Sequence, residues 1–335
     1  MNYQVSVIVP VYKVEKYIEK CARSLFEQTL SSIEFIFVDD CSPDNSIAIL
    51  KSVLNEYPSR ISDTRIVRHE YNRGLAAARN TGRSIAQGEY LISCDSDDWV
   101  DQNMYELMYQ KAQQTKSEIV ICDWEEVYIS KTLRQFINPP VNNIECVVAL
   151  LSGKMHGSVV NKLIKKTLYT EHNIMCKEGM DFCEDFYVTY RLFYFARTIA
   201  YINLPLYYYN KSNLNSYTST KLSESSQKGL ILLLNDIRKF FNEQQDGHIE
   251  IKKAILYFVN NIKSSILFYG SFSYARKLER TGIDSILCHP TLRIHSKIAL
   301  IFCNMNFWSG IKLIRYIYHN TAGHLVPADF QLFII

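Results

Sequence analysis

The sequence lacks several features that would assign it to a special class of protein. It contains no run of about 18 apolar residues, so we expect no segment that spans a bilayer. Its 37 basic and 34 acidic residues give a net charge of +3, which is too small to indicate a nucleic-acid partner. No basic stretch followed by an apolar stretch precedes Val5. We therefore expect no signal peptide and a cytoplasmic protein.

The sequence also lacks the cysteine spacing of a disulfide framework or a redox motif. The nine cysteines are odd in number, form no Cys-x-x-Cys pair and lie mostly in apolar runs. Buried free thiols in a reducing compartment explain this usage better than disulfides do. A hydrophobic content of 47% and a charged content of 21% are typical of a globular chain, and 335 residues suggest two domains.

The first half of the chain alternates between apolar strand patterns and helical patterns. Two of the strand segments are apolar almost throughout, which is typical of parallel strands covered by helices on both faces. The sequence thus predicts an α/β fold with a mostly parallel central sheet flanked by helices. The predicted strands are 5–11, 33–38, 64–68, 90–94 and 119–122, and the predicted helices between them are 14–26, 44–54 and 76–86.

Polar residues follow three of the predicted strands at their carboxyl ends. Tyr12 and Lys13 follow the first strand, the pair at 39–40 the second, and the acidic run at 95–98 the fourth. Ligands of parallel α/β sheets bind beyond the carboxyl ends of the strands, so we expect these groups to meet in one crevice.

The acidic run Asp95-Ser96-Asp97-Asp98 has two possible interpretations. Carboxylates packed so closely repel one another unless a cation neutralises them, and a hard divalent cation prefers oxygen ligands. The run then marks a metal and diphosphate site. Alternatively, it is a solvated turn that caps a helix beginning near Asp101.

Four segments resemble the motifs of inverting family 2 glycosyltransferases, which have the glycosyltransferase A fold. They are VSVIVPVYK, FIFVDDCSPDNS, NRGLAAARNTG and GEYLISCDSDDW, and they follow the family's order within about the first 100 residues. The resemblance implies a UDP-sugar donor bound with Mn²⁺ or Mg²⁺. Cys41 departs from the pattern, because the family commonly has Gly at this position.

The resemblance also implies roles for single residues. Tyr12 would stack on the base, Asp40 would accept a hydrogen bond from uracil, and Arg79 would lie along the nucleotide. Asp97 would bind the metal, with Asp95 near the ribose or a metal-bound water. As alternatives, Tyr12 is a core aromatic and Arg79 forms only a surface salt bridge, while Asp39 holds the loop. The full predicted donor set is Pro10, Tyr12, Asp40, Arg79, Asp95, Ser96, Asp97, Lys211 and Ser216.

The acidic segment around residue 184 resembles the family's Glu-Asp motif, which lies below the acceptor. An inverting transfer needs a base, and a carboxylate among aromatic residues can have a suitably raised pKa. We predict Asp185 as the base, with Glu184 second and Asp181 third. The alternative is that these acids only cap the helix 184–196. Further along, Lys211 and Ser216 lie in a stretch that resembles the segment that closes over the diphosphate.

The C-terminal third shows helical patterns and no strand pattern. We predict a catalytic domain at 1–220, with a nucleotide-sugar half at 1–123 and an acceptor half at 124–220, and a helical region at 221–335. Residues 286–335 carry four basic residues and one acid, Asp329, among apolar groups. This composition suits contact with the anionic inner face of the cytoplasmic membrane, or else core helices.

Together these features predict metal-dependent transfer of one sugar from a UDP-sugar to a lipid-linked carbohydrate acceptor in surface polysaccharide biosynthesis such as capsule. The processive members of the family carry Gln-x-x-Arg-Trp and membrane spans, and this sequence has neither. One alternative is a nucleotidyltransferase, but Val9-Pro10-Val11-Tyr12 lacks the Gly-rich loop such enzymes place there. The other is a carbohydrate-binding scaffold without catalysis.

Overall fold

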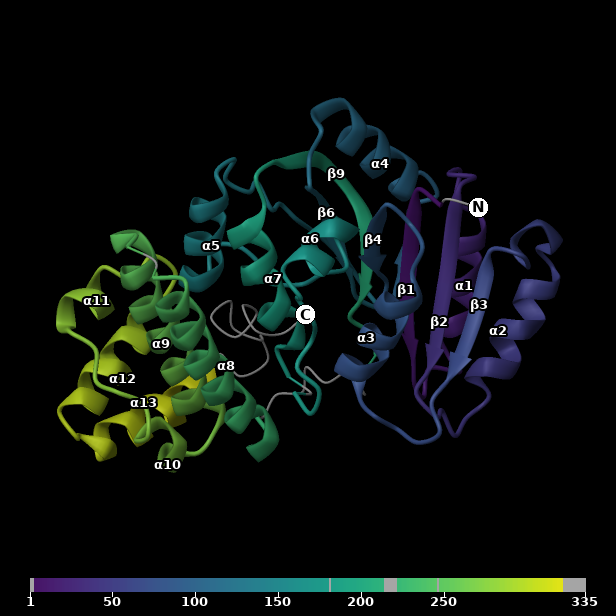
Figure 1. Cartoon of the computed structure of the whole chain (residues 1–335). Coiled ribbons are helices and arrows are strands. Elements are labelled where there is room, and N and C mark those ends of the chain that lie inside the picture. Colours follow the sequence, from purple (N-terminus) through teal and green to yellow (C-terminus); the bar gives the residue numbers. More distant parts are fainter. Residues whose placement is uncertain (1–2, 181, 214–221, 246, 322–335) are drawn as a thin grey trace. The chain divides into compact units, whose positions relative to one another are not determined.

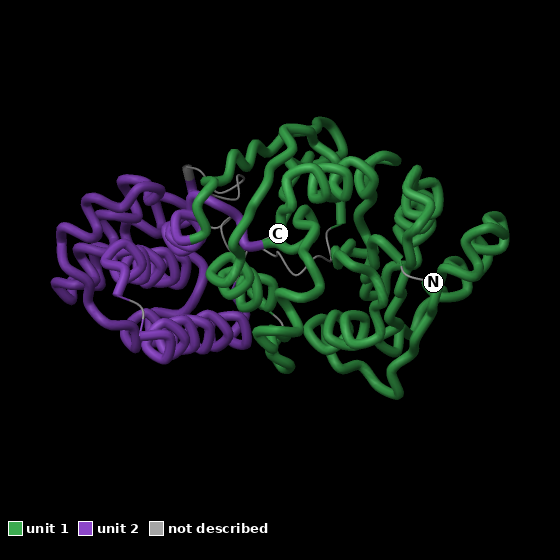
Figure 2. Tube along the Cα trace, turned by 45° about the horizontal axis from the view of Figure 1, so that its top comes forward, with its two compact units in different colours: residues 1–143, 158–214 green, residues 144–157, 215–335 purple. Residues whose placement is uncertain are grey.

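A computed structural model of the chain describes residues 3–180, 182–213, 222–245 and 247–321 (Figure 1). The chain divides into two compact units, which Figure 2 shows in two colours. Unit 1 comprises residues 1–143 and 158–214, and unit 2 comprises residues 144–157 and 215–335.

Unit 1 contains one mixed sheet, which has nine strands within the described residues. The strand order is β3-β2-β1-β4-β8-β6-β9-β5, and β7 pairs with β6. The first four strands in this order are parallel to one another, and β8 is antiparallel to both of its neighbours. The strands are β1 Val5–Val11, β2 Ile33–Asp39, β3 Thr64–Arg68, β4 Tyr90–Ser93, β5 Trp99–Val100, β6 Ile119–Val127, β7 Thr132–Gln135, β8 Lys162–Lys165 and β9 Ile199–Asn210.

The predicted α/β architecture of the first hundred residues is confirmed. All seven residues of β1 and of β2 are buried, as expected for parallel strands covered on both faces. Because β1 lies between β2 and β4 in a parallel arrangement, the ends of these three strands lie at the same edge of the sheet (Figure 1). The predicted meeting of the polar groups at 12–13, 39–40 and 95–98 rests on this topology.

Strand β6 is longer than the strand predicted at 119–122. It continues to Val127 and forms a ladder with β7, and its register with β9 shifts on either side of Asp123. Asp123 is fully buried, and its carboxylate accepts hydrogen bonds from Arg134 at 2.9 Å and from the Tyr201 hydroxyl at 2.7 Å. A buried charge at an irregular point of the strand interrupts the apolar pattern, so the pattern fails to show the second half of β6.

The helices of unit 1 flank this sheet, and helix α3 positions part of the site. Its small residues allow it to approach β1 closely: a Cβ added at Gly82 would lie 2.4 Å from Ile8 Cγ2. The close approach holds α3 against β1 and β2 and brings Arg79 into the interior. These helices are α1 Ile18–Phe26, α2 Ser46–Asn55, α3 Leu75–Ile85, α4 Met104–Thr115, α6 Lys166–Glu171 and α7 Glu184–Phe195, with a short 3₁₀ helix at Pro58–Arg60.

Unit 2 is helical throughout its described residues. Helix α9 is its centre, since α8 and α10 to α13 all pack against it and Phe258, Ile262 and Ile266 are buried on it. No helix among the described residues of the chain is long and apolar enough to cross a membrane. The helices are α5 Asn143–Ser152, α8 Glu224–Glu243, α9 Ile249–Tyr269, α10 Phe272–Ala275, α11 Ile283–Leu287, α12 Ile294–Asn304 and α13 Trp308–Thr321.

Candidate active site

Asp40 follows β2 and organises the loop that leads into α3. Its Oδ1 accepts a hydrogen bond from the backbone N–H of Arg73, and its Oδ2 from that of Gly74, both at 2.8 Å. Oδ1 also lies 2.7 Å from His69 Nδ1, and His69 Nε2 lies 2.9 Å from Thr81 Oγ1. The predicted contact with uracil therefore has to use the remaining acceptor capacity of this carboxylate, and it stays a prediction.

The other residues at the ends of β1 and β2 differ in their exposure to solvent. Pro10 is a buried residue of β1, opposite Val38. Tyr12 is 37% exposed, so the alternative of a core aromatic is wrong, and the Lys13 ammonium lies 5.0 Å from the centre of its ring. Asp39 is buried and its Oδ1 accepts from the Ser42 N–H at 2.7 Å, in agreement with a role in holding the loop.

The backbone conformation of Cys41 is one that glycine adopts easily, although the residue here is a cysteine. Its backbone has a φ of 58°, in the left-handed region that glycine adopts at no steric cost. The loop therefore keeps the conformation for which the related sequences commonly use glycine, and its acidic pair remains at the sheet edge.

Asp98 fixes the acidic turn that follows β4. Its backbone N–H donates to the Asp95 carbonyl at 3.1 Å, which closes the turn. Its buried carboxylate accepts hydrogen bonds from the Tyr207 hydroxyl at 2.6 Å and from the Asn210 backbone N–H at 2.7 Å. Burial, followed by the charge of Asp97, raises the pKa of Asp98 well above its usual value. Asp98 thus connects the turn to β9 instead of facing a ligand.

Asp97 lies beside Asp98 and keeps most of its acceptor capacity. Its Oδ2 accepts a hydrogen bond from Asn213 Nδ2 at 2.8 Å, and its carbonyl accepts one from Asn210 Nδ2 at 3.1 Å. Burial, followed by the charge of Asp95, raises the pKa of Asp97. A cation bound between Asp95 and Asp97 would relieve this repulsion. Ser96, between them, is buried.

Arg79 joins the acidic turn to the Glu-Asp segment. Its side chain is 1% exposed, so the alternative of a surface salt bridge is wrong. Nη2 donates to Asp95 Oδ1 at 2.9 Å, and Nη1 contacts both Glu184 Oε1 and Asp185 Oδ1. One buried guanidinium therefore holds three carboxylates that come from two distant parts of the sequence.

The two acids of α7 face this guanidinium instead of capping their helix. The N-cap position is Cys183, and no side chain caps there. Burial, followed by the charge of Asp185, raises the pKa of Glu184 to about 8, although Arg79 opposes the shift. Burial also raises the pKa of Asp185, whose Oδ2 lies 3.4 Å from the Val159 backbone nitrogen. The pKa values of both acids are therefore raised, which is a useful property for acid–base chemistry.

Lys211 and Ser216 complete the predicted set, with different outcomes. Lys211 Nζ lies 3.8 Å from Glu126 Oε1 and 4.2 Å from the centre of the Tyr209 ring. Burial lowers the pKa of this lysine. Ser216 and the third candidate base, Asp181, lie outside the described residues.

Sequence reasoning missed three partners of the site: His69, Asn210 and Asn213. Both asparagines lie in the segment that resembles the one closing over the diphosphate, in which the sequence predicts only Lys211 and Ser216 as donor contacts. Their amides bind the backbone and the side chain of Asp97. His69 comes directly after β3, at the same edge as Asp40, and this position was the available signal.

The acidic turn suits one kind of metal site. Within the described residues, no group of three or more His, Cys, Asp and Glu side chains could hold a metal ion by itself. Mg²⁺ and Mn²⁺ bound with a diphosphate need only one or two carboxylates, because phosphate oxygens and waters supply the other ligands. Asp97, with Asp95 beside it, meets this smaller requirement.

Comparisons with known proteins show the family of this chain. The model of glycosyl transferase family 2 matches residues 6–172. EpsH of Bacillus subtilis (strain 168), described as a putative glycosyltransferase, is 31% identical over 296 residues, which are 83% of this chain and 82% of EpsH. The chain belongs to glycosyltransferase family 2. The enzyme is therefore a glycosyltransferase, as its motifs predicted.

Solved structures confirm the glycosyltransferase A fold. The crystal structure of S. aureus TarS 1–349 in complex with UDP has a TM-score of 0.67 and 19% identity, over 95% of this chain and 91% of that chain. The mannosyltransferase PcManGT from Pyrobaculum calidifontis, in complex with GDP-Man and Mn²⁺, has a TM-score of 0.53 and 15% identity, over 96% and 88%. At these identities the likeness concerns the fold alone.

Proposed function

We propose that this glycosyltransferase moves a single sugar, with inversion, from a UDP-sugar to a hydroxyl of a carbohydrate acceptor, with the help of Mn²⁺ or Mg²⁺. The observation that carries the proposal is the buried cluster in which Arg79 holds Asp95, Glu184 and Asp185 together. It joins the acidic turn, which suits the donor, to a pair of acids with raised pKa, which suits proton transfer.

The donor side of the proposal uses the carboxyl edge of β1, β2 and β4. Tyr12, which is partly exposed, is proposed to stack on the base, and Asp40 offers an edge acceptor for uracil. UDP is favoured because the TarS neighbour was crystallised with UDP, although the PcManGT neighbour holds GDP-Man. Lys211 and Ser216 are proposed to approach the diphosphate when the donor is bound.

Asp97 is the proposed metal ligand, with Asp95 beside it. When bound there with the donor, the ion would offset the negative charge of the diphosphate as the sugar leaves. The Asn213 amide orients the Asp97 carboxylate through a hydrogen bond, and the Arg79 guanidinium offsets the negative charge of Asp95 through an ion pair. The Mn²⁺ in the PcManGT neighbour supports this choice of ion.

Asp185 is the proposed base. In an inverting transfer the acceptor oxygen forms a bond to the anomeric carbon, the bond from that carbon to the diphosphate breaks, and the acceptor proton passes to the base. Burial raises the pKa of Glu184 to about 8, so Glu184 is proposed as the member of the pair that holds a proton. The raised pKa of Asp185 brings it nearer to the working pH, where a general base is most effective.

The acceptor is proposed to be lipid-linked and to belong to the biosynthesis of a surface polysaccharide such as capsule. Two helices of unit 2 carry apolar residues that suit a membrane surface. On α12, Ile294 and Ile298 are exposed one turn apart, and on α13, Leu313, Tyr316 and Ile317 are exposed at helical spacing. If these faces bind an anionic membrane, Ile294→Ser with Leu313→Ser should release the protein from vesicles. Unchanged co-sedimentation would contradict the membrane contact.

The proposed reaction is tested by UDP release from a panel of UDP-sugars, with and without Mn²⁺. We expect release with one or a few donors, dependent on the ion and increased by a glycan acceptor. Formation of a sugar nucleotide from UTP and a sugar phosphate would instead support a nucleotidyltransferase. Glycan binding without turnover of any donor would support a non-catalytic scaffold.

A further inference from the structure

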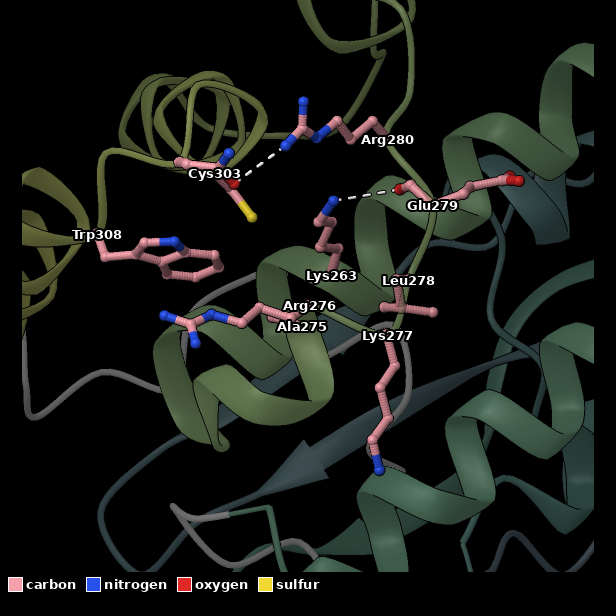
Figure 3. A pocket seen from close by; sticks show the side chains of 10 residues that line it. Lys263, Ala275, Arg276, Lys277, Leu278, Glu279, Arg280, Cys303 and Trp308 are labelled. Carbon is pink, nitrogen blue, oxygen red and sulfur yellow. Dashed lines mark hydrogen bonds between the residues drawn. The ribbon is translucent and has the colours of Figure 1, made fainter.

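Unit 2 contains a cavity that the proposed reaction does not use. It has a volume of about 790 Å³ and is bordered by residues from α9, α10, the segment after α10, and the ends of α12 and α13 (Figure 3). Of its ten lining residues, four are basic, Lys263, Arg276, Lys277 and Arg280, and one is acidic, Glu279. This excess of positive charge is unlike the remainder of the chain, whose basic and acidic residues nearly balance.

Three of the basic side chains are directed at the cavity without a carboxylate partner. Within the described part of the chain, Lys263, Arg276 and Arg280 form no ion pair with an acid. Lys263 is buried, and its Nζ donates to the Glu279 backbone carbonyl at 3.2 Å. Arg280 Nη2 donates to Asn306 Oδ1 at 3.0 Å. In Figure 3 Lys263 and Arg280 extend into the same space beside Cys303, whereas Lys277 points away from them.

The one acid at the cavity does not neutralise these cations. The Glu279 carboxylate is paired with Arg238 and extends away from the other lining side chains in Figure 3. Burial lowers the pKa of Lys263, because burial disfavours the charged ammonium group. A cationic cavity of this kind is suited to an anionic ligand.

Trp308 adds an apolar wall to the charged cavity. The Arg276 guanidinium lies 4.3 Å from the centre of the Trp308 ring, and this stacking holds its planar fork in place. Such a fork binds phosphate through two parallel hydrogen bonds. Leu278 and Ala275 complete the apolar part of the wall. The cavity thus joins three cationic side chains to an apolar surface for an attached organic group.

We propose that this cavity binds an organic phosphate ester, for which glycerol 3-phosphate is the probe. Arg276, Arg280 and Lys263 bind the phosphate, and the organic group of the ester lies against Trp308. The same chemistry is offered by the head group of a phospholipid and by a soluble glycerol phosphate. The lining residues of the cavity all belong to unit 2, and none of them is in the predicted donor set, so the proposal does not depend on the transferase reaction.

The test is calorimetric titration of the full chain with glycerol 3-phosphate, in the presence of saturating UDP and Mn²⁺ to occupy the donor site. The variant Arg276→Gln/Arg280→Gln removes two exposed charges from the cavity, and binding should weaken at least about tenfold. The matched control is Lys252→Gln/Lys253→Gln, which removes two exposed charges from α9 outside the cavity. This control should bind like the wild type.

A second arm identifies the source of the phosphate. Co-sedimentation with phosphatidylglycerol vesicles that depends on Arg276 and Arg280, without binding of glycerol 3-phosphate, would support the proposal with a lipid as ligand. Quenching of Trp308 fluorescence by the ligand, lost in Trp308→Phe, provides a readout in a chain with intact arginines. The proposal is overturned if neither ligand binds, or if the cavity variant binds both as well as its matched control does.

Discussion

The central structural role of Arg79 gives the sharpest prediction. Arg79→Met keeps much of the side-chain volume but leaves Asp95, Glu184 and Asp185 without their shared cation. Removing one partner of a buried ion pair costs about 3–5 kcal/mol, because the remaining charge stays buried. The Asp95 side chain is 26% exposed and adds little to this figure, whereas the Glu184 and Asp185 side chains are 9% and 12% exposed.

The expected loss appears in the free energy of unfolding and in Tm. A loss of about 3–5 kcal/mol lowers Tm by roughly 6–20 °C, at about 2–4 °C per kcal/mol for a domain of this size. Without the guanidinium the pKa values of both acids rise further, since Arg79 lowers them in the wild type. The variant therefore loses stability relative to the wild type as the pH rises, and the difference should be smaller at pH 5 than at pH 8.

The assay is urea and thermal unfolding of both proteins at these two pH values. The matched control is Arg83→Met, one turn later on α3, where the guanidinium lies against Cys176 Sγ at 3.2 Å and 4.9 Å from the Tyr169 ring centre. Within the described residues Arg83 forms no ion pair with an acid, so its loss should cost less and change little with pH. Equal destabilisation of the two variants, or an effect of Arg79→Met that is independent of pH, would refute the electrostatic account.

Three further predictions concern groups around the site and in unit 2. The pKa of Glu184 is raised from 4.5 to about 8, so its protonated form stabilises the folded state below pH 4.5, and this stabilisation is lost as the pH rises through 8. As the pH rises over this window, the Tm of Glu184→Gln should therefore increase relative to that of the wild type. Parallel Tm profiles of the two proteins would contradict this prediction. Tyr207→Phe removes a donor from buried Asp98 and should cost about 1–3 kcal/mol in urea unfolding. Tyr105→Phe is its control, since that buried hydroxyl has no hydrogen-bond partner within the described residues, and an equal cost would oppose the role given to Asp98. The pKa of His289 is lowered from 6.5 to about 4 by burial, so wild-type stability should fall as the pH falls from 6.5 to 4, whereas His289→Asn should show a flatter Tm profile.

The sequence alone predicted the parts of the fold that depend on local pattern. The β-branched run Val5–Val11 and the apolar run that begins at Ile33 are strands with the predicted starts. The order of polar groups after the strands indicated the edge where the site lies, because parallel strands end at a common edge. The second half of β6 was missed since Asp123, a buried charge at a register shift, breaks the pattern there.

The contacts inside the site depend on tertiary structure and could not be predicted. Arg79 and Asp185 are 106 residues apart in sequence, and only the packing of α3 and α7 brings them together. Similarly, nothing local to Asp40 shows that its oxygens hold the backbone of Arg73 and Gly74. Residue type and position in the sequence identified the carboxylates as candidate site residues. Long-range packing determines which groups each of them contacts.

The central claim about this enzyme is that Asp97 binds the metal ion and Asp185 acts as the base. One paired measurement tests this claim most directly. UDP is titrated calorimetrically into Asp97→Asn and Asp185→Asn with and without Mn²⁺, and transfer is measured with the donor that the wild type uses. We predict that Asp97→Asn loses the Mn²⁺-dependent part of UDP binding, whereas Asp185→Asn binds UDP like the wild type and loses transfer. Near-wild-type transfer by Asp185→Asn would contradict the account and make Glu184 the next candidate for the base.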